Sequence, residues 1–126
     1  MAKVVRPDGA KPLGLPGRIS SEIVSGAHGG SLSCTLRIVE VPVSKPGTPG
    51  RVRHCHDTHE ECIYVLSGRG STQSGSARHE LAAGDTILIP PGEMHVTTNT
   101  GAEPLMLLCY FPVAEITMRL EGENRP

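Results

Sequence analysis

Short apolar segments, each ended by glycine or proline, constrain the fold of this chain most. Fifteen glycines and eleven prolines divide the 126 residues into pieces too short for helices of ordinary length. Residues 61–67, 86–89 and 105–111 are apolar, β-branched or aromatic in large part, which is typical of β-strands. About nine or ten such strands with regular turn signals predict an all-β sandwich or barrel in a single domain.

The net charge of −1 and the three aromatic residues argue against some partners. A nearly neutral chain gains no electrostatic attraction to nucleic acid or to an anionic membrane, and few aromatic rings are available for base stacking. No helix-turn-helix segment is evident, so a DNA-binding regulator is disfavoured. We expect no nucleic-acid partner and no membrane partner.

Four cysteines occur without a Cys-x-x-Cys pattern, and the N-terminus lacks the apolar run of a signal peptide. No apolar stretch reaches the length of a membrane span. These features predict a cytoplasmic protein with reduced thiols.

Histidines at alternate positions mark the centre of the chain. On an extended strand His54 and His56 face the same side and Cys55 faces the other, as a packed thiol. Glu61 has the wrong parity for that strand, so residues 57–60 must form a turn, and a hairpin can return the carboxylate to the imidazoles. Two imidazoles and a carboxylate are ligands that a divalent transition metal accepts.

A fourth candidate ligand follows a second glycine-rich and proline-rich stretch. After the strand expected at 86–89, the corner Pro90-Pro91-Gly92 turns the chain back and leads to His95. Asn99 begins another tight turn and is interpreted as structural.

These two stretches resemble the two motifs of the cupin family. Gly50 lies closer to His54 than the first motif has it, and four residues instead of three separate His56 from Glu61, which leaves Glu60 as a rival ligand. Glu61 is preferred because six residues then separate it from Gly68, as the motif requires. The matching residues are Gly50, His54, His56, Glu61 and Gly68 in the first motif, and Gly84, Pro90, Gly92, His95 and Asn99 in the second.

The resemblance implies a double-stranded β-helix, the jelly-roll cupin barrel, with a metal ion near one open end. The implied ligands are His54, His56, Glu61 and His95, and Fe, Mn, Ni, Co and Zn all suit them. We expect an N-terminal arm at 1–17, the barrel at 18–120 and a flexible tail at 121–126. The family also suggests a homodimer, with Val4-Val5 as a short edge strand.

The function expected from this resemblance is that of a small metalloenzyme acting on an oxygenated small organic molecule, by dioxygenase, isomerase or lyase/cyclase chemistry. Candidates for proton transfer are Glu60, His59 and Tyr64. The more conservative interpretation makes His59 a solvated turn residue and Tyr64 a packing residue. The alternative function is a non-catalytic metal-binding or ligand-binding module or sensor, because a fold does not determine a function.

Four other side chains are assigned to the surface by position. Strand parity turns Arg51 and Arg53 away from the ligands, which favours surface charges over substrate contacts. His28 and His79 are expected in exposed positions. Residues 114–120 are expected to form a short helix or a strand.

Overall fold

The computed structural model describes residues 1–47 and 50–124, which are folded almost wholly into strands. One short 3-10 helix, η1 (Pro7–Gly9), precedes the first strand. The strands are β1 (Lys11–Leu13), β2 (Ile19–Val24), β3 (Thr35–Val41), β4 (His54–Cys55), β5 (Glu61–Ser67), β6 (Arg69–Ser74), β7 (Ala77–Ala82), β8 (Thr86–Ile89), β9 (His95–Asn99), β10 (Leu105–Phe111) and β11 (Arg119–Leu120).

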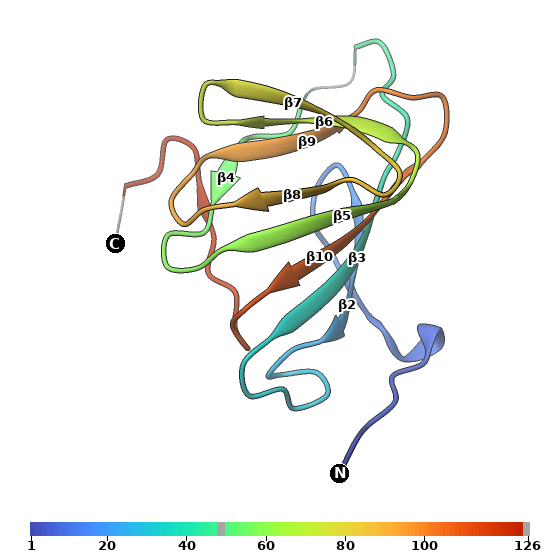
Figure 1. The fold of residues 1–126 in the computed structure, drawn as a ribbon, viewed down its shortest axis with the longest axis vertical. Helices are drawn as coiled ribbons and strands as arrows, with labels where there is room; N and C mark the ends of the chain where they lie inside the picture. Colours follow the sequence, from blue (N-terminus) through green and yellow to red (C-terminus); the bar gives the residue numbers. More distant parts are fainter. Residues whose placement is uncertain (48–49, 125–126) are drawn as a thin grey trace.

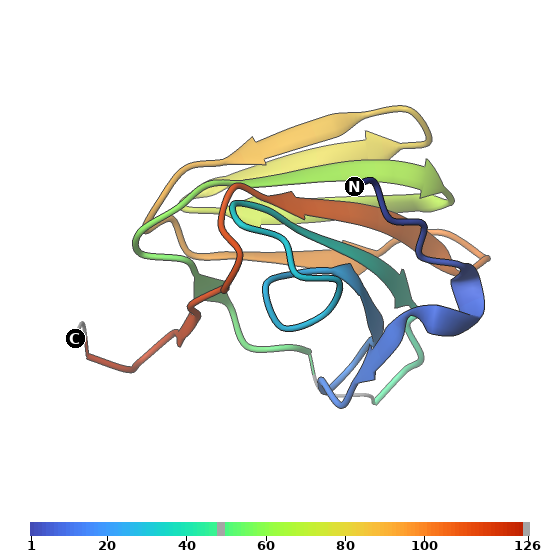
Figure 2. The same ribbon diagram turned by 90° about the horizontal axis from the view of Figure 1, so that it is seen from below.

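The strands form two antiparallel sheets (Figure 1). The six-stranded sheet has the order β1-β2-β3-β10-β5-β8, and the five-stranded sheet has the order β11-β4-β9-β6-β7. From β3 onward every connection except β6–β7 crosses from one sheet to the other, so the two sheets are wound together. Figure 2 shows the C-terminal segment running past β4, with which β11 pairs. The expected all-β jelly roll is confirmed.

The side chains of β10 alternate between the core and the outer face, as expected for a β-strand. Its residues are buried alternately, so that Leu105 and Leu107 face the interior while Met106 and Leu108 lie partly open on the other side. A fully buried leucine such as Leu105 contributes about 1.5–3 kcal/mol to folding. The core between the sheets consists of Val39, Val41, Ile63, Val65, Leu81, Ile89, Leu105, Leu107, Cys109 and Phe111.

Two glycines lie where the chain passes from one sheet to the other, Gly68 between β5 and β6 and Gly70 within the first residues of β6. Gly68 has a φ of 88°, and a Cβ there would lie 2.8 Å from the carbonyl oxygen of Pro104. A Cβ on Gly70 would lie 2.5 Å from Cδ2 of Leu105. Only glycine fits this crossing, because a side chain would meet backbone at one position and the core at the other.

Strands 61–67, 86–89 and 105–111 have the predicted limits, while the ends of the chain differ from expectation. Val4-Val5 is not a strand, and the edge strand is Lys11–Leu13, which pairs with β2. Residues 114–118 are irregular and only Arg119–Leu120 pair, so the segment forms no helix. Within the described residues, no helix is long and apolar enough to cross a membrane.

Candidate metal centre

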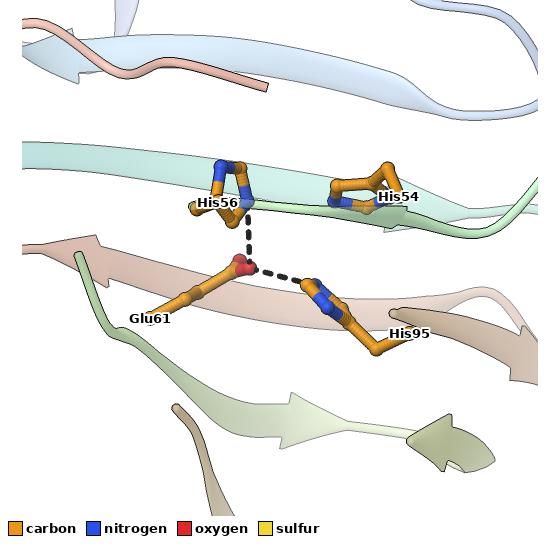
Figure 3. A group of neighbouring side chains, drawn as sticks. All are labelled: His54, His56, Glu61 and His95. Atoms are coloured by element: carbon orange, nitrogen blue, oxygen red, sulfur yellow. Dashed lines mark hydrogen bonds and ion pairs between the residues drawn. The ribbon is translucent and has the colours of Figure 1, made fainter. Parts of the chain in front are cut away.

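Four side chains converge between the two sheets: His54, His56, Glu61 and His95 (Figure 3). Each offers a ligand atom, and these atoms all lie within 4.8 Å of one another. Three of the residues are almost fully buried, with exposed fractions of 4% for His56, 5% for Glu61 and 1% for His95. These are the four residues that the sequence singled out as ligands.

Both sheets contribute to this group. Strand β4 pairs with β9 in the five-stranded sheet, where His54 lies directly opposite His95. Glu61 is the first residue of β5, in the six-stranded sheet. The expected hairpin between the two segments is wrong, because β4 and β5 do not pair. Residues 57–60 instead form a turn that carries the chain from one sheet to the other, which places the carboxylate opposite the imidazoles.

In the two most deeply buried imidazoles, those of His56 and His95, both ring nitrogens lie near an oxygen atom. Nδ1 of His56 lies 2.7 Å from the carbonyl oxygen of Thr117, and Nδ1 of His95 lies 2.9 Å from that of Glu93. The Nε2 atoms of these rings lie 3.3 and 3.1 Å from Oε1 of Glu61. A neutral imidazole has one N–H, whereas each ring here faces two oxygens that accept hydrogen bonds.

A cation beside Nε2 resolves this conflict. With Nδ1–H donating to the carbonyl, Nε2 presents its lone pair, which is how a metal-ligating histidine is commonly oriented. Nε2 of His56 is buried and has no hydrogen-bond partner among the described residues. The donor set therefore fits a divalent transition metal ion.

The charges of the remaining two ligands suit the same role. Burial, followed by the neighbouring imidazoles of His95 and His56, lowers the pKa of His54 to about 3, so its ring stays neutral and can donate a lone pair. Burial alone would raise the pKa of Glu61. When the Nε2 atoms of His56 and His95 carry protons, their hydrogen bonds and charges outweigh burial and lower that pKa to about 2, and a metal ion in place of those protons would likewise keep the carboxyl group ionised.

His59 is buried, with an exposed fraction of 5%, so the prediction of a solvated turn residue is wrong. Its ring stacks on that of His56 with the ring centroids 5.0 Å apart, and it lies edge-on to Phe111 with the centroids 5.9 Å apart. Its Nε2 accepts the backbone N–H of Thr117 at 3.4 Å. His59 thus supports His56, together with the C-terminal segment that covers both rings.

Glu60 and Tyr64, the other proton-transfer candidates, lie away from the ligands. Glu60 is exposed and lies outside the four-residue group, which contains Glu61. Tyr64 is 41% exposed on the outer face of its sheet, opposite Leu108 of β10. Neither residue lines the cavity beside the ligands.

That cavity has a volume of about 220 Å³ and contains arginines that the sequence interpretation did not place there, Arg18, Arg37 and Arg51. The prediction that Arg51 is a surface charge is wrong, because β4 is only two residues long and strand parity does not extend back to position 51. Arg53 does face outward and pairs with Glu121.

Of the remaining assignments from sequence, those of Asn99, Cys55 and His79 agree with the structure, and the exposed position expected for His28 is wrong. Asn99 is structural, since it is buried and bonds to the carbonyl oxygens of Val41 and Glu103. Cys55 is fully buried and its thiol lies 3.6 Å from Asp57. His79 is exposed on β7, whereas His28 is half-buried and bonds to the carbonyl oxygen of Gly9.

Two wound antiparallel sheets with three imidazoles and a carboxylate gathered between them define the cupin class of protein. The chain belongs to this family: the profile of the cupin domain matches residues 41–111. Residues 41–111 include all four members of the ligand group.

Known proteins similar to this chain include an uncharacterized protein of Methanocaldococcus jannaschii. It is 45% identical over 56 residues, which cover 44% of this chain and 45% of that protein. The chain thus spans less than half the length of this curated relative.

Solved structures share the fold at lower identity. Oxalate decarboxylase of Lactobacillus farciminis, in a formate complex, is 23% identical with a TM-score of 0.77 over 90% of this chain and 34% of that chain. The polyketide cyclase RemF of Streptomyces resistomycificus is 23% identical with a TM-score of 0.73, covering 99% of this chain and 89% of that one. A structure of Bacillus subtilis oxalate decarboxylase, described by its Mn(II) centres, is 22% identical with a TM-score of 0.73, over 88% of this chain and 30% of that chain. At these identities the likeness shows the fold alone.

Proposed function

We propose that the chain binds a divalent transition metal ion through His54, His56, Glu61 and His95. The observation that carries the proposal is the buried Nε2 of His56, which has no hydrogen-bond partner in the described chain and faces an ionised carboxylate. Three neutral imidazoles and one carboxylate leave a net positive charge on a divalent ion. Fe, Mn, Ni, Co and Zn all suit these ligands, and the Mn(II) centres of the B. subtilis decarboxylase make Mn(II) a natural first choice.

We further propose that the protein is a small metalloenzyme whose substrate is an oxygenated organic molecule. A bound ion supplies Lewis acidity, polarising an oxygen of the substrate. The chain itself supplies a cavity with a cationic part at the arginines and an apolar part at Leu107 and Phe111. Similarity to proteins named as an oxalate decarboxylase and a polyketide cyclase supports small-molecule chemistry of the dioxygenase, isomerase or lyase/cyclase kind.

One observation favours a second function, a non-catalytic binding module. Apart from the four ligands, the cavity is lined by no His, Asp, Glu or Tyr of the described chain, and its Cys109 is an unsuitable acid or base. Burial, followed by the charge of Glu61, raises the pKa of the Cys109 thiol well above its ordinary value. Outside the ligand group, the described cavity wall therefore offers no side chain suited to proton transfer near neutral pH.

Metal content tests the binding proposal. Protein stripped with a chelator, loaded with Mn(II) and desalted should retain a stoichiometric amount of metal by elemental analysis. His56→Ala should lose most of it, because one of four ligands is missing. His79→Ala is the matched control, since His79 is exposed on β7 and should leave metal content unchanged. Full metal retention in His56→Ala would refute the assignment.

Turnover distinguishes the two functions. The Fe(II)-loaded protein is mixed with diketones or catechols, and both oxygen consumption and product formation are followed. Catalysis that disappears in His56→Ala supports the enzyme. Tight binding of a ligand without any conversion supports the binding module.

A further inference from the structure

Two arginines of the cavity have no acidic partner. Arg37 is paired with Glu22 at 3.2 Å, and Ser25 donates a second hydrogen bond to that carboxylate at 2.6 Å. Arg18 and Arg51 line the same cavity, yet neither forms an ion pair with any carboxylate of residues 1–47 and 50–124. The cavity therefore contains two arginines without an ion-pair partner, and Glu61 of the ligand group is the one carboxylate of the described cavity wall, whose charge acts on both without contacting them.

These two guanidinium groups are held in place by backbone. Arg51 donates to the carbonyl oxygen of Thr97 on β9, and its aliphatic stem lies on Gly17, where a Cβ would be 2.6 Å from Cγ of Arg51. Arg18 donates to the carbonyl oxygen of Pro16 at 3.1 Å. Each guanidinium has five N–H groups, so most of them remain available to a ligand.

Holding two such cations together is unfavourable without an anion. Burial, followed by the charge of Arg18, lowers the pKa of Arg51 to about 10, and burial followed by the charge of Arg37 lowers that of Arg18. Both groups stay charged at neutral pH, half-buried and mutually repelling. An oxyanion between them would remove the repulsion and accept charge-assisted hydrogen bonds.

We propose that Arg18 and Arg51 bind the carboxylate of a small organic acid whose second oxygen faces the ligand group of His54, His56, Glu61 and His95. Apolar side chains of the same cavity, Ile63, Leu107 and Phe111 among them, would contact the hydrocarbon part of the acid. The cavity volume of about 220 Å³ suits a small acid. The role of the second oxygen rests on the proposed metal function, whereas the carboxylate site does not.

Binding of 2-hydroxybenzoate and 2-oxopentanoate to the full chain, followed by calorimetry, tests this site. Each acid carries one carboxylate, a second oxygen and a hydrocarbon part. The uncharged 2-hydroxybenzamide and inorganic phosphate are the comparison probes. We expect at least one acid to bind, the amide to bind far more weakly, and phosphate to bind more weakly than the acids because it has no hydrocarbon part.

Three variants locate the interaction. Arg18→Gln and Arg51→Gln should each weaken binding of the acid by about 10- to 100-fold, the range expected for a charge-assisted hydrogen bond. Arg53→Gln is the matched control, because Arg53 faces outward and pairs with Glu121. Arg51→Lys, which keeps the charge but not the planar fork, should bind with intermediate affinity and guards against a folding defect in Arg51→Gln.

The outcomes separate this inference from the proposed metal function. The inference is overturned if neither acid binds, if the amide or phosphate binds as well as the acids, or if Arg18→Gln and Arg51→Gln bind like the parent. Metal analysis of the same samples reports independently on the metal site. Arginine-dependent binding of the acid to a protein that retains no metal would overturn the metal proposal alone.

Discussion

Replacing Glu61 by glutamine should stabilise the metal-free protein and reduce the stabilisation that the metal provides. The change keeps the size of the side chain but replaces an oxygen that lies 3.1 Å from Nε2 of His95 and 3.3 Å from Nε2 of His56. An amide NH₂ in that place can donate to both lone pairs, whereas the carboxylate cannot. At pH 8 the metal-free variant should therefore be more stable than the parent by about 1–2 kcal/mol.

The metal should stabilise the parent more than the variant. An ion present at about 100 times its dissociation constant stabilises the protein that binds it by about 2.7 kcal/mol. For a chain of 126 residues, with an unfolding entropy of about 2.1 cal/mol/K per residue, that gain raises Tm by about 10 °C. Glu61→Gln loses the only anionic ligand of the group, so its Tm should rise by less than about a third of this amount.

Scanning calorimetry at pH 8, with and without Mn(II), measures both effects. Glu60→Gln is the control, because Glu60 is the exposed neighbour of Glu61 in the chain and should behave like the parent under both conditions. A full metal-induced rise in Glu61→Gln with none in Glu60→Gln would move the ligand to Glu60. A metal-free Glu61→Gln protein several kcal/mol less stable than the parent would refute the lone-pair argument itself.

Two further predictions concern the supports of the cavity. Burial would raise the pKa of Glu22, but its hydrogen bonds with Ser25 and Arg37 outweigh burial and lower that pKa below the ordinary 4.5. The ionised Glu22 therefore stabilises the folded protein above pH 4.5, and this stabilisation is lost as the pH falls through the folded pKa. Glu22→Gln should therefore lower the free energy of unfolding at pH 7 by about 1–3 kcal/mol. Urea titrations should show that the difference from the parent shrinks below pH 4.5, and a difference independent of pH would refute this prediction. A chain cut before Thr117 lacks the carbonyl group that orients His56, so it should bind Mn(II) about 10- to 100-fold more weakly. Competition with a chelating dye measures this affinity, and an unchanged value would contradict the role of Thr117.

Local patterns in the sequence were sufficient for several strands and for the grouping of His54, His56, Glu61 and His95. The apolar runs of β5, β8 and β10 are bounded by glycine, proline or polar residues that end a strand. The spacing of His54, His56 and Glu61, together with a second motif ending near His95, identified the group that the structure brings together. Choosing Glu61 over Glu60 depended on the distance to Gly68, and the structure explains that distance, because Gly68 is where the chain must leave the sheet that holds Glu61.

The misplaced residues depend on contacts from distant parts of the chain. His59 is buried by Thr117, which lies 58 positions later, and nothing within the turn indicates that cover. Arg51 was assigned by strand parity, but it precedes β4 and takes its orientation from Thr97 and Gly17. Arg18 directly precedes β2, where local sequence does not distinguish a surface cation from one that faces a cavity.

The division of the ligand group between the two sheets has a mechanical consequence. His54 and His95 belong to one sheet and Glu61 begins a strand of the other, so an ion held by all four residues would act as a clasp between the layers. Sliding of one layer over the other would then require a coordination bond to stretch or break. Removing the ion should therefore speed amide hydrogen exchange in β4 and β5 together, even though these strands share no hydrogen bonds.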